Sequence, residues 1–111
     1  MCQSNDINFT QMQEIQRELQ EKYRAQWGGL SPDKGVSHLL WMLAEAGEAA
    51  QVVKKKGNAA IGSDPDVRRH FIEEMCDVMM YFNDVLLCYD ITPKELAAVY
   101  REKHRVNMQR W

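Results

Sequence analysis

Four carboxylates form two pairs with the same spacing along the chain. Glu45 and Glu48 are three positions apart, and so are Glu74 and Asp77. On a helix, side chains three positions apart project from one face within a single turn. If two such helices pack antiparallel with these faces opposed, the four carboxylates converge on one pocket. Carboxylate oxygens are ligands that Mg²⁺ and Mn²⁺ prefer, so the pattern predicts a divalent-cation site.

Other interpretations fit parts of this pattern. Glutamate is a good helix former, and pairs with this spacing are common on solvated helix faces. Glu73 and Asp84 lie near Asp77 on the same predicted helix face, where they either add a ligand or only widen the acidic field, so they rank below the main four. A ferritin-like di-iron site needs Glu-x-x-His, and no histidine of the chain follows a glutamate at that spacing. The di-iron interpretation is therefore disfavoured.

The residues around the carboxylate pairs predict helices. Glycine and proline punctuation leaves four blocks with helical length and composition, and no segment shows sustained alternation with period two. The predicted helices cover residues 10–26, 36–56, 65–89 and 92–111. The sequence therefore predicts one all-α domain over residues 1–111, a four-helix bundle whose second and third helices are antiparallel and central.

Three of the predicted helix starts carry residues that satisfy free backbone N–H groups. Thr10 followed by Gln13 resembles a capping box at the start of the first helix. Asp64 before Pro65 is a typical start for the third helix, and Thr92 is a typical cap for the fourth. The start of the second helix has no comparable signal.

The second predicted helix is apolar on two sides. One face carries Val36, Leu39, Leu40 and Leu43. The opposite side carries His38, Trp41, Glu45, Glu48 and Val52. A helix with apolar residues on both sides is expected to be buried on both sides, and a chain of ~110 residues buries a limited share of its surface by itself. We therefore expect self-association.

Composition excludes several classes of function. The chain has 14 Lys and Arg against 16 Asp and Glu, so it lacks the basic excess with which proteins bind duplex nucleic acid. No apolar run approaches the ~20 residues that span a bilayer, and the first residues do not resemble a signal peptide. Cys2, Cys76 and Cys88 form no C-x-x-C pair, which favours a reducing compartment. We expect a cytoplasmic protein that binds neither duplex nucleic acid nor a membrane.

The segments that carry the carboxylates, LLWMLAEAGEAAQVVKKKG and FIEEMCDVMMYF, resemble the MazG-like all-α nucleoside triphosphate pyrophosphohydrolases. The family pattern is E-E-x-x-E followed, after a spacer, by E-x-x-D. Glu45 and Glu48 match its second and third acidic positions, and Glu74 and Asp77 match its second half. Ala44 stands where the family has its first glutamate. The resemblance extends over about residues 10–111.

This resemblance implies hydrolysis of a nucleoside or deoxynucleoside triphosphate to the monophosphate and pyrophosphate. It also implies that the four carboxylates hold Mg²⁺, for which Mn²⁺ is a possible substitute, and that the chains form dimers or dimers of dimers. Divalent ions suit this reaction because they neutralise the triphosphate, activate water and stabilise the leaving group. Glu45 is our choice for the carboxylate that also orients or deprotonates the water.

Seven residues are candidates for holding the nucleotide. Those that resemble family positions beside the nucleotide or its phosphates are Trp27, Tyr81, Lys103 and Asn107. Those suggested by helical spacing or by nearby charge are Trp41, Lys55 and Arg110. Aromatic rings stack on bases and cations bind phosphates. Each candidate also has a structural interpretation, which is core packing for the rings and a solvated helix end for the cations.

A second class of function is a catalytically silent helical interaction or regulatory module. In that interpretation Ala44 reflects the decay of an ancestral site. The two classes differ in their response to metal, because an ion that binds the folded chain stabilises it by mass action.

Overall fold

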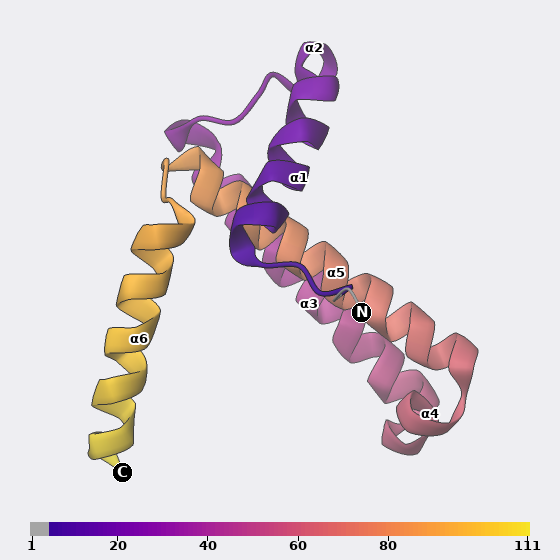
Figure 1. Cartoon of the computed structure of the whole chain (residues 1–111). Helices are drawn as coiled ribbons and strands as arrows, with labels where there is room; N and C mark the ends of the chain where they lie inside the picture. The colour runs from indigo at the N-terminus through magenta and orange to yellow at the C-terminus, as the bar shows by residue number, and fades with distance from the viewer. Residues whose placement is uncertain (1–4) are drawn as a thin grey trace.

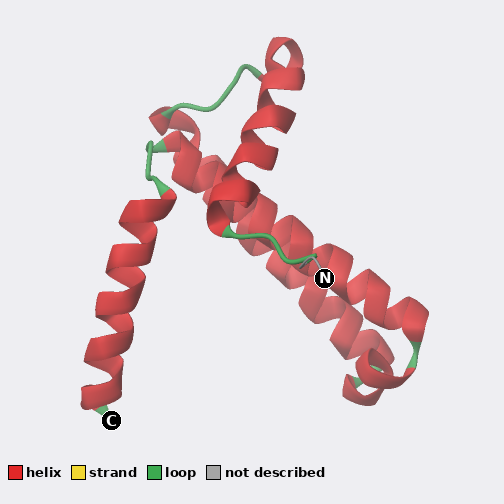
Figure 2. Ribbon diagram, in the orientation of Figure 1, coloured by secondary structure: helices red, strands yellow, loops and turns green. Residues whose placement is uncertain are grey.

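The computed structural model describes residues 5–111, which form an open arrangement of helices around one long pair (Figure 1). In chain order the elements are α1 (Phe9–Lys22), α2 (Arg24–Trp27), the 3-10 helix η1 (Pro32–Lys34), α3 (Gly35–Lys56), α4 (Asn58–Ser63), α5 (Pro65–Cys88) and α6 (Pro93–Arg110). Figure 2 shows helices and loops without a strand over residues 5–111, so the predicted all-α class is confirmed. Cys2 lies outside the described residues. None of the described helices is long and apolar enough to cross a membrane.

The centre of the fold is the antiparallel pair of α3 and α5, as predicted (Figure 1). α3 ends at Gly57, where a φ of 89° turns the chain into the short helix α4. α5 starts as expected, because the Asp64 side chain accepts hydrogen bonds from the backbone N–H groups of Asp66 and Val67. Gly35 lets the start of α3 approach the end of α5, since a Cβ there would overlap the phenol of Tyr89.

The first helix starts differently from the prediction. The capping box is formed by Asn8 and Gln11, so the prediction of Thr10 and Gln13 is wrong. The Gln11 N–H donates to Asn8 Oδ1, and the Asn8 N–H donates to Gln11 Oε1, both at 2.9 Å. Both residue pairs satisfy the same sequence rule, and α1 begins at Phe9 because the Asn8 backbone is extended. The helix also ends earlier than predicted, at Lys22.

α1 packs across α5 with both aromatic and buried polar side chains, and the rings of Phe9 and Phe82 lie 6.2 Å apart between centroids. Gln13, Gln16 and Gln20 are buried, whereas Ile15 is 48% exposed. The Gln13 side-chain N–H donates to the Ile91 carbonyl at 3.1 Å. A buried amide is stable only when it is hydrogen-bonded, and Gln16 and Gln20 find their partner in Asp84 on α5.

α6 diverges from the central pair after the turn that follows α5 (Figure 1). The turn contains Asp90 at a φ of 53°, and α6 starts at the predicted cap Thr92, which forms a capping box with Glu95. Within residues 5–111, α1 is the helix against which α6 packs. The four long helices are therefore present, but within one chain they do not close into a four-helix bundle.

One face of α3 remains uncovered in the single chain. Val36, Leu40 and Leu43 are 61%, 58% and 57% exposed. The side chains of Ile72 and Met75 on α5 are also about half exposed. This is the apolar face that the sequence predicted to be buried, and in one chain it faces away from every packed helix. Exposed apolar surface of this kind is typical of protein–protein contacts.

Candidate functional site

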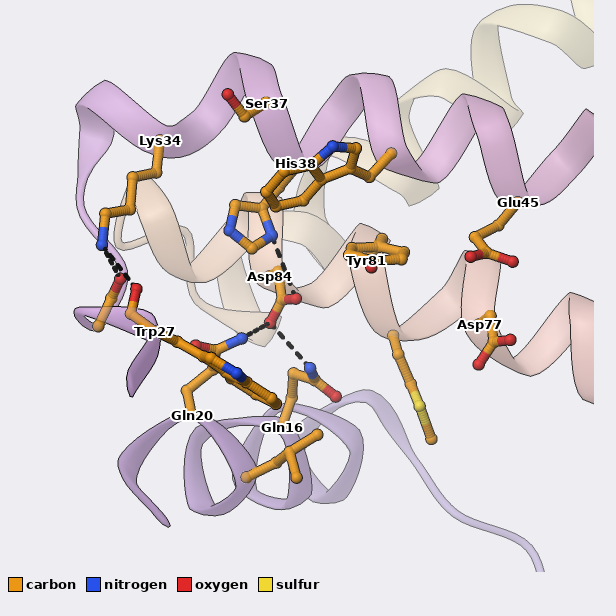
Figure 3. A pocket seen from close by; sticks show the side chains of 14 residues that line it. Gln16, Gln20, Trp27, Lys34, Ser37, His38, Glu45, Asp77, Tyr81 and Asp84 are labelled. Carbon is orange, nitrogen blue, oxygen red and sulfur yellow. Dashed lines mark hydrogen bonds and ion pairs between the residues drawn. The ribbon is translucent and has the colours of Figure 1, made fainter. Parts of the chain in front are cut away.

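The structure brings three of the four predicted carboxylates together at the middle of the central pair. Glu45 and Glu48 project from α3 and Glu74 projects from α5, with one oxygen of each lying within 4.8 Å of the others. Asp77, one turn after Glu74, lines the same pocket as Glu45, and Figure 3 shows both carboxylates on neighbouring helices. We call these four residues the carboxylate cluster.

The pKa of Glu45 is raised within the carboxylate cluster. Partial burial, together with the neighbouring carboxylates Glu48, Glu74 and Asp77, raises the pKa of Glu45 from its ordinary value of 4.5 to about 7. Among the described residues, Glu45 Oε2 and Glu74 Oε2 are buried without a hydrogen-bond partner. Hard oxygen donors that converge and remain unpaired fit a Mg²⁺ or Mn²⁺ ion.

Two charged neighbours of the cluster clarify which acidic residues belong to it. Glu73 points away from the cluster into an exposed ion pair with Arg69, whose Nε lies 3.3 Å from Glu73 Oε1. His70 contacts the cluster, because its Nε2 lies 3.3 Å from Glu74 Oε1. The sequence analysis missed His70, although its i, i+4 spacing from Glu74 was a usable signal.

Asp84 belongs to a separate buried arrangement. Its Oδ1 accepts hydrogen bonds from Gln16 Nε2 at 2.9 Å and Gln20 Nε2 at 3.2 Å, and its Oδ2 lies 3.3 Å from His38 Nδ1. Figure 3 shows Gln16 and Gln20 of α1 and His38 of α3 converging on Asp84 of α5. We call the four residues the Asp84 network. The sequence analysis ranked Asp84 as a secondary ligand and did not foresee its glutamine partners.

Burial and hydrogen bonding have opposite effects on Asp84. The residue is 2% exposed, and this burial raises the pKa of its carboxyl group, whereas the hydrogen bonds from Gln16 and the contact with His38 lower it. The net pKa is above the ordinary value. A buried carboxylate with three polar partners rigidly joins the helices that carry them.

The Asp84 network and two residues of the carboxylate cluster line a common pocket of about 770 Å³, which we call the aromatic pocket (Figure 3). Its polar lining includes Glu45, Asp77 and the Asp84 network, and its aromatic lining includes the predicted residues Trp27, Trp41 and Tyr81. The rings of Trp41 and Tyr81 lie 6.0 Å apart between centroids. Burial and the nearby Glu45 and Asp84 charges raise the pKa of Tyr81. The pocket therefore offers flat apolar walls beside the carboxylates.

The loop before α3 holds Trp27 at the edge of this pocket. Gly28 and Gly29 adopt positive φ angles of 82° and 74°, which end α2 and turn the chain back. The Lys34 ammonium donates hydrogen bonds to the carbonyls of Gly29 at 2.6 Å and Trp27 at 3.2 Å. Trp27 also stacks on Tyr23, with centroids 4.6 Å apart. The ring is thus fixed by a closed loop rather than by core packing.

A second pocket of about 530 Å³ lies on the other side of the cluster, towards the C-terminal end of α3. We call it the lysine pocket, and its charged lining residues are Glu48, Lys55, Lys56, Asp66, His70 and Glu74. Lys55 is a predicted substrate-binding residue that the structure places next to the cluster. Lys56 and His70 were not predicted.

Three of the predicted residues lie far from this site along the fold. Lys103, Asn107 and Arg110 are exposed on α6, which extends away from the central pair (Figure 1). The Arg110 guanidinium lies 4.9 Å from the ring centroid of Trp111. Within one chain the structure does not bring these residues to the carboxylate cluster.

Comparisons with known proteins give no independent identification. No protein-family model matches the chain, and no curated protein or solved structure is significantly similar to it.

Proposed function

We propose that the chain is a Mg²⁺-dependent nucleoside triphosphate pyrophosphohydrolase of the MazG-like kind. The observation that carries the proposal is the convergence of Glu45, Glu48 and Glu74 oxygens within 4.8 Å, beside an aromatic-lined pocket. The cluster fits a divalent cation because its buried oxygens have no hydrogen-bond partner among the described residues. The aromatic pocket has the size and flat walls that suit a nucleoside.

The proposed reaction breaks the bond between the α-phosphorus and the oxygen that bridges it to the β-phosphorus. A water oxygen bonds to the α-phosphorus, and pyrophosphate leaves with the electron pair of the broken bond. Glu45, whose pKa lies near 7 without metal, accepts the proton of the attacking water. When bound, Mg²⁺ supplies charge neutralisation of the triphosphate and of the leaving group. No protein nucleophile is required.

The remaining residues position the substrate in this proposal. The rings of Trp27, Trp41 and Tyr81 stack against the nucleoside. The Asp84 network holds α1 and His38 against the pocket, so that its walls are fixed before the substrate binds. The base and the sugar that the pocket prefers depend on contacts that only a bound nucleotide defines.

Self-association is part of the proposal. A second copy that covers Val36, Leu40 and Leu43 would bury the exposed apolar face of α3, which makes a homodimer the minimal assembly and a homotetramer an extension of it. Such an assembly would also give α6, with Lys103 and Asn107, a second chain to contact. We further propose a reducing, cytoplasmic location, since Cys76 and Cys88 are free thiols.

The test is pyrophosphate release from a panel of ribo- and deoxyribonucleoside triphosphates with Mg²⁺, with Mn²⁺ and with EDTA. We expect metal-dependent turnover of one or a few members, inhibited by EDTA. Silence across the panel from folded protein would favour the alternative, an interaction module, which the exposed apolar face of α3 would serve. In that case Ala44→Glu tests whether the missing family glutamate restores activity.

A further inference from the structure

The two pockets lie on opposite sides of the carboxylate cluster. Glu45 and Asp77 line the aromatic pocket, and Glu48 and Glu74 line the lysine pocket. Because α3 and α5 are antiparallel, these are two successive levels of the same helix pair. A molecule bound across the cluster therefore has one end in each pocket.

The charges of the two pockets differ. Within residues 5–111, Lys34 is the one lysine or arginine that lines the aromatic pocket, and its ammonium is bonded to the carbonyls of Trp27 and Gly29. The same pocket contains the buried carboxyl group of Asp84. A phosphate at this end would meet a buried acidic group without a free cation to offset it, which is unfavourable.

The lysine pocket carries two lysines beside its carboxylates. Lys55 and Lys56 are exposed at the last turn of α3 and line the pocket together with Glu48, Asp66 and Glu74. Their ammonium groups are carried on flexible side chains. His70 stands on α5 at the same level and is held in place by Glu74. Lysine ammonium groups bind phosphate oxygens as mobile point charges.

We propose that the lysine pocket receives the β- and γ-phosphates of the substrate and holds pyrophosphate after cleavage, with Lys55 and Lys56 as its cationic wall. This inference rests on the proposed function and adds the orientation of the bound substrate. The nucleoside lies at the end of the cluster nearer α1, and the β- and γ-phosphates lie at the end nearer α4. Glu48 and Glu74 line the same pocket, so pyrophosphate binds there together with the divalent cation that those carboxylates hold.

The experiment uses the intact chain with Mg²⁺ and two probes, imidodiphosphate as a non-hydrolysable pyrophosphate and the nucleoside monophosphate of the best substrate in the panel. Binding of each probe is measured by calorimetry for the wild type, the double variant Lys55→Gln/Lys56→Gln, and Lys54→Gln. Lys54 is the matched control, because it precedes the two lysines on α3 but does not line the pocket. All three positions are exposed, so the variants are expected to fold.

We expect the double variant to weaken imidodiphosphate binding roughly tenfold or more, which is the range for losing charge-assisted contacts. It should leave monophosphate binding within about twofold, and Lys54→Gln should leave both unchanged. Equal weakening by the double variant and by Lys54→Gln would overturn the inference, because it would show only a general surface charge effect. Equal weakening of the two probes by the double variant would also overturn it.

The outcome is separable from that of the proposed function. Wild-type turnover with a double variant that binds imidodiphosphate normally would reject the pyrophosphate pocket and leave the hydrolase proposal intact. Lysine-dependent binding of imidodiphosphate without any turnover would reject the hydrolase and leave the anion pocket. Failure of the wild type to bind imidodiphosphate with Mg²⁺ would reject the pocket directly. If the nucleotide panel is silent, deoxycytidine and adenosine monophosphates serve as the monophosphate probes.

Discussion

Two groups of acidic side chains on the α3–α5 pair differ in their hydrogen bonding. Asp84 is buried and has three polar partners, from α1 and α3. Glu74 lies between two and three turns before Asp84 on α5, and Glu45 lies across the pair on α3. Each has a buried oxygen, Oε2, with no hydrogen-bond partner among the described residues. Gln16 and Gln20 donate hydrogen bonds to the Asp84 carboxylate, whereas the two glutamate oxygens accept none from the described part of the chain. Asp84 therefore joins helices, and the glutamates are the residues that we propose hold a cation.

The largest expected effect is the loss of activity when the carboxylate cluster is altered. Glu48→Gln keeps the shape of the side chain but removes a charge from the cluster, so we expect pyrophosphate release to fall at least ~10²-fold, as when charge stabilisation of a transition state is removed. The fold should be retained, because Glu48 is exposed. Steady-state kinetics and circular dichroism measure the two effects.

Glu73→Gln is the matched control for that variant. Glu73 is adjacent to Glu74 in sequence, but its side chain is 62% exposed and pairs with Arg69. Turnover should stay within about twofold of the wild type, because exposed ion pairs contribute little. Equal losses in Glu48→Gln and Glu73→Gln would mean that net acidity, and not the cluster, supports the activity.

The second effect is a loss of stability when the Asp84 network is altered. Asp84→Ala leaves the amides of Gln16 and Gln20 buried without their acceptor, so we expect the free energy of unfolding to fall by about 3 kcal/mol. Urea denaturation with and without Mg²⁺ measures it. The loss should be the same in both conditions, and a loss seen only with Mg²⁺ would place Asp84 among the metal ligands instead.

The third effect is stabilisation by metal. At about 100 times its dissociation constant, an ion that binds only the folded chain adds about 2.7 kcal/mol to the free energy of unfolding. We expect a Mg²⁺-dependent rise in melting temperature for the wild type and for Glu73→Gln, and none for Glu48→Gln. Differential scanning calorimetry distinguishes these outcomes. An identical rise in all three proteins would contradict metal binding at the cluster.

The smallest effect follows from the raised pKa of Glu45. An acid whose pKa rises from 4.5 to about 7 on folding binds more protons in the folded chain than in the unfolded chain between these pH values. The free energy of unfolding therefore falls as the pH rises through this window. In EDTA at pH 8, Glu45→Gln should melt a few degrees above the wild type, while at pH 4 the difference should vanish. A variant that is less stable at pH 8 would show that the ionised Glu45 is already compensated.

The comparison also shows what the sequence could reveal. The carboxylate cluster was predictable because Glu45 with Glu48 and Glu74 with Asp77 are local pairs on two helices whose antiparallel packing follows from their order. The Asp84 network was not predictable, because glutamines are common on exposed helix faces. Gln16 and Gln20 become buried partners of Asp84 only because α1 packs across α5. The choice between Asn8 and Thr10 as the cap of α1 was not predictable either, because both residues satisfy the capping rule.

The direction of α6 was likewise beyond the sequence pattern. Thr92 predicted the start of α6, but the direction of the helix depends on a turn in which Asp90 takes a positive φ. Short connections between helices usually produce packed neighbours, and here the helix leaves the pair instead. Within one chain, Lys103 and Asn107 therefore lie away from the carboxylate cluster (Figure 1).

The most direct test of the central claim follows the oxygen of the attacking water. The best substrate of the panel is hydrolysed in ¹⁸O-labelled water with Mg²⁺, and the products are analysed by ³¹P NMR and mass spectrometry. We predict one labelled oxygen in the nucleoside monophosphate and none in the pyrophosphate, with no reaction in EDTA and at least ~10²-fold slower labelling with Glu48→Gln. Label in inorganic phosphate or pyrophosphate, or labelling by Glu48→Gln at the wild-type rate, would contradict hydrolysis at the α-phosphorus by the carboxylate cluster.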